Sequence, residues 1–226
     1  RLIYRSLPQI ENRRYPASGG IPRTFMLNYD TSYRNAIKLL QETADLDKVS
    51  DRRGAERVSH NDKDCLSFKY FGEAAMLCLP DCSIEPDSLD QGELILILHY
   101  FETEGSPDTT APEVTFQSLP GGMFYYPTFR KRGPNRVLND FGENPEDLIK
   151  TGEKLNWKAG TLGDASLIVP VLPEIFVTVV LHAGDEEFPS EAQFLFKKDI
   201  LSLIPLEDVA VIGTILATKL TIAKHQ

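Results

Sequence analysis

Residues 162–189 constrain the fold of this chain most, because they combine a high density of β-branched side chains with a dense acidic cluster. Two short apolar runs, 165–169 and 175–181, are bounded by prolines, and their length and composition predict two strands. Apolar side chains occupy both alternating sets of positions in the second run. We therefore expect this strand to be covered on both faces, since a strand with one solvated face alternates more cleanly.

Helical patterns precede and follow these strands. Residues 33–44 carry apolar side chains at helical spacing, and Pro205 stands where a terminal helix can begin. The apolar run 94–101 follows Ser88 and Gln91 at capping-box spacing, which favours a buried helix and leaves a central strand as the alternative. Residues 66–79 suggest a small hairpin. Because strands and helices do not alternate regularly, we predict an α+β fold: a small mixed or antiparallel sheet packed with several helices.

The distribution of charge divides the chain into two parts. The chain has 226 residues and a net charge of -9, but residues 1–29 carry a balance of +4, which leaves -13 on the rest. We predict an extended basic arm over 1–29 and a single α+β domain over 30–226. An acidic body argues against nucleic-acid binding, which needs a basic footprint. The arm is apolar as well as basic, so we expect it to bind a partner protein through Arg1, Arg5, Arg13, Arg14 and Arg23.

The cysteines and the absence of long apolar runs suggest a compartment. Cys65, Cys78 and Cys82 are odd in number, and their spacing matches no zinc or iron-sulfur motif. We therefore expect free thiols and no cofactor. No apolar run approaches the roughly 18 residues of a membrane helix, and no signal peptide is recognisable, so we expect a cytoplasmic protein without membrane contact.

An aromatic and basic stretch occupies residues 116–132, which read FQSLPGGMFYYPTFRKR. Its two glycines allow a tight backbone path, and Phe124, Tyr125, Tyr126 and Phe129 place four aromatic rings within six residues before three basic residues. Three interpretations remain open. The rings form a core plug with the arginines tied to the acidic cluster, or the stretch is a shelf for an anionic ligand, or it faces a partner protein, since Tyr, Phe and Arg are enriched at interfaces.

The acidic cluster follows the second predicted strand. Carboxylates with one imidazole could hold a divalent metal or act as general acid or base, or they could simply cap a turn and pair with the basic stretch. Adjacent residues of an extended strand point to opposite faces and seldom converge on one ion, so we assign no metal. The candidate ligand-binding positions are Gly121, Gly122, Tyr125, Tyr126, Arg130, Arg132, Asp164, His182, Asp185, Glu186 and Glu187.

Four segments resemble an uncharacterised prokaryotic family, DUF3786. They are LPGGMFYYPTFRKR (119–132), LGDASLIVPVLP (162–173), GDEEFPSEAQFLF (184–196) and PLEDVAVIG (205–213). The resemblance implies a setting in anaerobic bacteria and archaea, where some members are joined to an iron-sulfur cluster domain of the corrinoid-protein type. This chain departs from the pattern in two ways: it has no cluster-binding cysteine set, and His182 stands where an aromatic residue such as Trp is expected.

These observations favour a non-catalytic role. No nucleophile motif such as G-x-S-x-G is present, and the four histidines are scattered, with His99 inside an apolar run that suggests a core position. We therefore expect an accessory subunit or protein-interaction module. Its partner would be a larger metalloenzyme of anaerobic metabolism with iron-sulfur or other metal cofactors, one-carbon metabolism being one such setting. The alternative is a small-molecule or cofactor-binding domain, enzymatic or not, with a pocket between residues 121–132 and 185–187.

Overall fold

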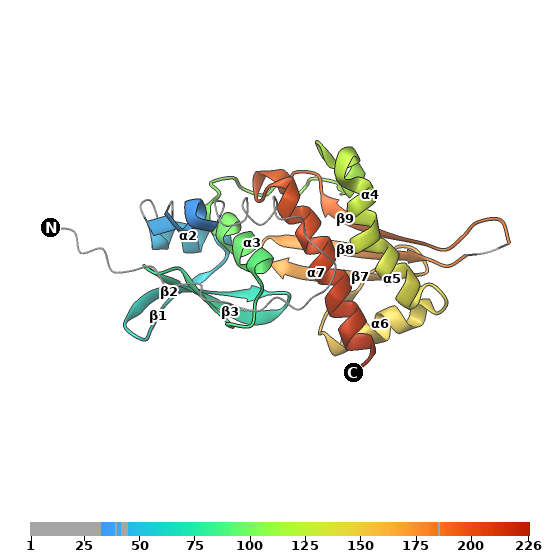
Figure 1. The fold of residues 1–226 in the computed structure, drawn as a ribbon, viewed down its shortest axis with the longest axis horizontal. Helices are drawn as coiled ribbons and strands as arrows, with labels where there is room; N and C mark the ends of the chain where they lie inside the picture. The colour runs from blue at the N-terminus through green and yellow to red at the C-terminus, as the bar shows by residue number, and fades with distance from the viewer. Residues whose placement is uncertain (1–32, 39, 42–44, 185) are drawn as a thin grey trace.

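The structure is a computed structural model, and it describes residues 33–38, 40–41, 45–184 and 186–226. The predicted arm with its five arginines and the candidate Asp185 lie outside the described residues. Two antiparallel sheets and several helices make up the described part, which confirms the α+β prediction (Figure 1). No helix in these ranges combines the length and the apolar character needed to cross a membrane.

The first sheet has the strand order β1-β2-β3-β4. Its strands are β1 (Glu56–His60), β2 (Lys63–Tyr70), β3 (Glu73–Leu79) and β4 (Ser83–Glu85). The predicted hairpin is confirmed as β2 and β3, joined by the two-residue turn Phe71 and Gly72, both at positive φ. Such turns match the twist of the paired strands. Leu66, Phe68 and Tyr70 alternate onto the buried face, where Phe68 meets Phe101 edge to face at 4.8 Å.

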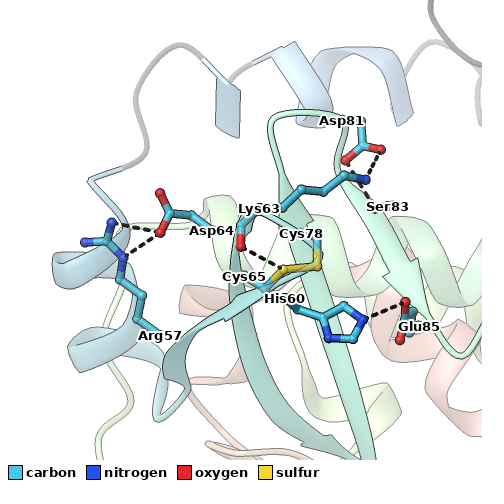
Figure 2. The surroundings of a disulfide bond; sticks show 9 residues. All are labelled: Arg57, His60, Lys63, Asp64, Cys65, Cys78, Asp81, Ser83 and Glu85. Atoms are coloured by element: carbon cyan, nitrogen blue, oxygen red, sulfur yellow. Dashed lines mark hydrogen bonds and ion pairs between the residues drawn. A yellow bond between two sulfur atoms is a disulfide. The ribbon is translucent and has the colours of Figure 1, made fainter.

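The prediction of three free thiols is wrong for two of the cysteines. Cys65 on β2 lies directly opposite Cys78 on β3, with their Cα atoms 4.1 Å apart, and the two form a disulfide (Figure 2). Cys82 in the following turn stays a free, buried thiol. The linear spacing of the cysteines does not reveal this pairing, because it depends on the register of the hairpin.

The second sheet has the order β5-β9-β8-β7-β6. Its strands are β5 (Glu113–Thr115), β6 (Lys158–Ala159), β7 (Ala165–Leu172), β8 (Ile175–His182) and β9 (Glu191–Lys197). The two strands predicted within 162–189 are confirmed as β7 and β8. Helices lie over the face that carries Leu167, Val177 and Val179 (Figure 1). The expected cover on both faces is only partial, since Ile168 and Phe176 on the other face are 38% and 46% exposed.

The helices are α2 (Leu46–Arg53), α3 (Gln91–Glu102), α4 (Gly122–Arg132), α5 (Pro134–Phe141), α6 (Pro145–Lys154) and α7 (Leu206–Lys224), with 3-10 turns η1 (Phe116–Ser118) and η2 (Ile200–Ser202). The run 94–101 is helical, as favoured, but its cap differs from the predicted one. Asp90 accepts a hydrogen bond from Glu93 N, and the Glu93 side chain accepts one from Asp90 N. The capping box therefore begins at Asp90, two positions after the predicted cap Ser88, and the helix begins two residues later than predicted.

The two sheets meet where the turn between β2 and β3 contacts the end of β7. Phe71 N donates a hydrogen bond of 2.9 Å to Val171 O, and Trp157 Nε1 donates one of 3.2 Å to Phe71 O. Helix α7 runs diagonally over the covered face of the second sheet and lies beside α5 and α6 (Figure 1). The predicted terminal helix after Pro205 is thus confirmed, and it closes a single continuous apolar cluster that includes residues of both sheets.

Candidate functional site

Helix α4 begins at the glycine pair identified in the sequence. Gly121 has φ 79°, which favours glycine, and Gly122 N donates a hydrogen bond of 2.8 Å to Leu119 O. A Cβ on Gly122 would lie 2.0 Å from Phe116 O, so only glycine fits this close approach. The expected tight backbone path is therefore present, and it fixes the direction in which α4 leaves η1.

The helical period separates the aromatic rings of α4 into two sets. Phe129 is buried, stacks on Phe116 at 4.0 Å between ring centroids, and meets Phe194 and Phe196 edge to face. Tyr126 is partly buried on the same side. The first turn points outward instead: Met123 is 65%, Phe124 90% and Tyr125 47% exposed. The core-plug interpretation therefore holds for Phe129 and fails for Phe124 and Tyr125.

The last turn of α4 carries the basic residues Arg130, Lys131 and Arg132, all exposed. Cations at this end of a helix interact favourably with its dipole. Arg130 Nε donates a hydrogen bond of 3.2 Å to Asn135 Oδ1. One short helix thus exposes three large apolar side chains at its start and three cations at its end.

The acidic candidates lie on the segment between β8 and β9 and at its root. Asp164 Oδ2 accepts a hydrogen bond of 2.8 Å from Ala183 N, which places this carboxylate beside the end of β8. His182, Glu186 and Glu187 are exposed. Within the described ranges, no group of three or more His, Cys, Asp or Glu side chains is arranged to hold a metal ion.

A small hollow separates α4 from the start of β9, close to where the alternative interpretation places a pocket. Tyr126 and Phe129 line one side of it, and Glu191 and Gln193 line the other. Its volume is about 30 Å³. Small-molecule sites measure about 300 to 1,000 Å³, so this hollow has room for one or two water molecules only.

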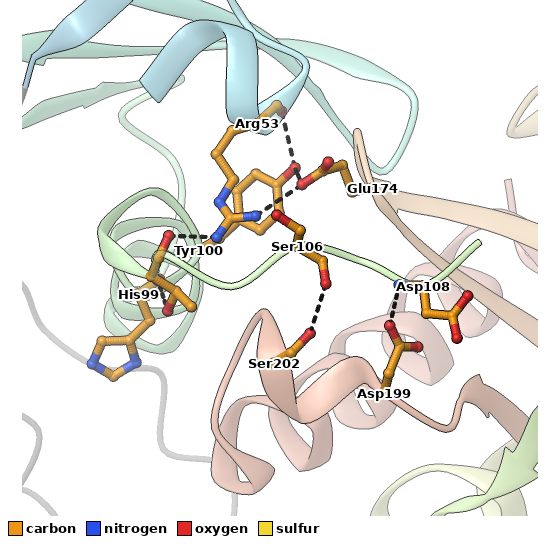
Figure 3. Close-up of polar contacts among 9 residues, drawn as sticks. Arg53, His99, Tyr100, Ser106, Asp108, Glu174, Asp199 and Ser202 are labelled. Carbon is orange, nitrogen blue, oxygen red and sulfur yellow. Dashed lines mark hydrogen bonds and ion pairs between the residues drawn. The ribbon is translucent and has the colours of Figure 1, made fainter. Parts of the chain in front are cut away.

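Two largely buried polar groupings have no counterpart in the sequence patterns. His99 Nδ1 lies 2.7 Å from Asp208 Oδ2. Arg53 Nη1 lies 2.9 Å from Glu174 Oε2 (Figure 3). Tyr100 also belongs to the second grouping, since its hydroxyl donates to Arg53 O at 2.9 Å. The residues of each pair are separated by about a hundred positions in the chain, and no local pattern signals that they meet.

The surroundings of these groups shift their protonation equilibria. Burial disfavours the imidazolium of His99, but the hydrogen bond and charge of Asp208 outweigh it and raise the pKa of His99. Burial raises the pKa of Asp208, against the lowering effect of His99. Burial also raises the pKa of the Cys82 thiol to about 12, so this cysteine is a poor nucleophile.

A family model described as a domain of unknown function (DUF3786) matches residues 45–219. No curated protein and no solved structure matches the chain.

Proposed function

Because the chain belongs to the DUF3786 family of domains of unknown function, we propose its role from its own surface: it is a protein-interaction module that serves as a non-catalytic accessory subunit. The larger partner is an enzyme of anaerobic metabolism that carries iron-sulfur or other metal cofactors, and the partner is bound without nucleic acid. This setting follows from the family resemblance, whereas the interaction role follows from helix α4.

The observation that carries the proposal is the exposed first turn of α4. Met123, Phe124 and Tyr125 are consecutive, and each leaves about half of its side chain or more in solvent. Fully burying a side chain of this kind is worth about 1.5 to 3 kcal/mol. In the isolated domain these three side chains gain only part of the free energy of burial. A partner that covers the first turn of α4 would bury them further and would be stabilised by the remainder.

The positive charges at the end of α4 indicate which kind of segment can bind there. Arg130, Lys131 and Arg132 stand on the same helix, although the chain as a whole has a net charge of -9. A segment that pairs with this helix should therefore combine an apolar anchor with acidic residues, because complementary charge speeds association and selects the partner. We name the surface formed by Met123, Phe124, Tyr125 and Arg130–Arg132 the α4 docking surface.

Photo-crosslinking of the full chain tests this role. A photoreactive phenylalanine analogue at position 124 should crosslink to a partner in native extracts, and unlabelled protein carrying Phe124→Ser should compete poorly for the same partner. Phe176→Ser is the matched control, because Phe176 is a half-exposed phenylalanine on the sheet face away from α4. A chain that migrates alone in gentle chromatography and gives no crosslink at position 124 contradicts the proposal.

The alternative, a ligand pocket between 121–132 and 185–187, has less support. The hollow of about 30 Å³ beside Tyr126 would have to enlarge roughly tenfold to admit a small molecule. A thermal-shift screen of the pure protein tests this alternative, since a ligand that binds only the folded state raises the melting temperature.

A further inference from the structure

We infer that the segment received by the α4 docking surface is residues 186–188 of a second copy of this chain, so that two copies form a reciprocal dimer. The inference rests on the proposed function, because it takes α4 as a docking surface and names what docks there. In the dimer each α4 docking surface is covered by the second copy, so the larger enzyme would bind the dimer at another part of its surface.

The donor segment lies on the long connection between β8 and β9. Its described part projects beyond the ends of the strands and away from the helices (Figure 1). Glu186 and Glu187 are exposed there, and Phe188 is 66% exposed. An aromatic ring next to two carboxylates, on a projecting segment, has the form of an anchor with acidic flanks.

The two surfaces complement each other in both charge and polarity. Glu186 and Glu187 match the cations Arg130 and Arg132, and the Phe188 ring matches the apolar first turn of α4. Aromatic pairs gain about 0.5 to 1.5 kcal/mol beyond the area they bury. Residues 186–188 thus have the acidic and aromatic composition that complements the α4 docking surface.

The positions of the two surfaces allow a closed pair. Tyr126 of α4 and Glu191 at the start of β9 line the same hollow, so the docking helix and the root of the donor segment are neighbours. In a two-fold interface each copy must carry both complementary halves, and this chain carries both, with the base of the donor segment beside α4. Two-fold symmetry would form the contact twice and double the buried area, which favours a stable dimer.

Sedimentation of three proteins tests the inference. Wild type should sediment as a dimer at micromolar concentration. The variants Glu186→Arg with Glu187→Arg, and Arg130→Glu with Arg132→Glu, should each dimerise about a hundredfold more weakly, because each places like charges together. Added salt should weaken the wild-type dimer, since exposed charges are screened.

An equal mixture of the two variants provides the decisive result. In the mixed pair one contact joins native charges and the other joins reversed charges, so both contacts are attractive and the dimer should return. The control is Glu104→Arg with Glu153→Arg, which changes the net charge equally at exposed positions elsewhere and should leave wild-type dimerisation unchanged. Circular dichroism of each variant establishes that it is folded.

The outcomes separate this inference from the proposed function. A monomeric wild type, or a mixture that stays monomeric, overturns the second-copy inference. If crosslinking at position 124 still captures a different protein in that case, the proposed function stands alone. A dimer that survives both charge reversals also overturns the inference, because a different interface then holds the copies together.

Discussion

His99 Nδ1 and Asp208 Oδ2, 2.7 Å apart, join the last turn of α3 to the first turn of α7. An imidazolium is favoured at a helix C-terminus and a carboxylate at a helix N-terminus, so both helix dipoles support the charged pair. The Asp208 side chain is almost fully buried, whereas that of His99 is 20% exposed. The pair therefore ties together two helices that are far apart in the chain, and its strength depends on pH.

Stability should fall as pH rises through the titration of His99. The pKa of this imidazole is raised in the folded protein, so its stabilisation is fully present below the ordinary value of 6.5 and is lost as pH rises through the raised value. The negative charges of Glu102 and Glu207 also raise the pKa of His99. His99→Ala should cost about 3 kcal/mol near pH 6 and less at alkaline pH, measured by urea unfolding.

The control for this experiment is His60→Ala. His60 Nε2 and Glu85 Oε1 are 3.7 Å apart and solvent-exposed, so the loss of this pair should cost no more than about 1 kcal/mol. If His99→Ala and wild type show the same pH dependence, another group is responsible for it.

The Arg53 side chain should be required for holding helix α2 against α3 and the β7–β8 turn. Its guanidinium is fully buried, contacts Glu174 and Thr103 O, and lies over the Tyr100 ring at 5.1 Å (Figure 3). Arg53→Ala leaves the Glu174 carboxylate without its cation, and we expect a loss of about 3 to 5 kcal/mol in the free energy of unfolding. Arg53→Lys should restore only part of it, because an ammonium cannot reproduce the planar, forked geometry. Arg57→Ala, which removes exposed ion pairs, should cost far less.

Reduction of the disulfide should destabilise the first sheet. Cys65 and Cys78 are separated by 13 positions, and closing a loop of this size is worth about 2 to 4 kcal/mol. We expect a dithiol reductant to lower the urea midpoint of wild type and to leave that of the Cys65→Ser, Cys78→Ser double variant unchanged. A wild-type midpoint that ignores the reductant would show that the bond contributes no stability.

Gly213→Ala should destabilise the protein, although alanine is the better helix former. A Cβ at this position of α7 would lie 2.4 Å from Phe129 Cε2, and the Phe129 ring is held by its stack on Phe116. Helix propensity favours the change by about 1 kcal/mol, but displacement of a packed ring costs about 1 to 3 kcal/mol. We expect a net loss of about 1 kcal/mol in thermal unfolding, against a near-neutral Thr214→Ala in the same helix.

The sequence predicted elements that depend on local patterns. Strands β7 and β8, the β2–β3 hairpin and helix α7 follow from apolar runs, turn residues and prolines, all of which act over a few positions. The pairing of the two disulfide cysteines also follows from the position of the hairpin turn. A two-residue turn at Phe71 and Gly72 pairs Tyr70 with Glu73 and, counting outward, Cys65 with Cys78.

The candidate site was predicted in composition but not in orientation. The rings and cations of residues 121–132 are evident in the sequence, but they are compatible with three interpretations. The position of α4 against β9 places Phe129 in the core and Phe124 in solvent, and a helix that docked with a different rotation would exchange them.

The sequence by itself determined where strands and helices form, because backbone preference and side-chain periodicity are set by neighbouring residues. Only the tertiary structure decided which polar groups meet, as His99 does with Asp208 and Arg53 with Glu174. These contacts require segments about a hundred positions apart to pack at one orientation, and that orientation results from burial of the whole core rather than from any single stretch.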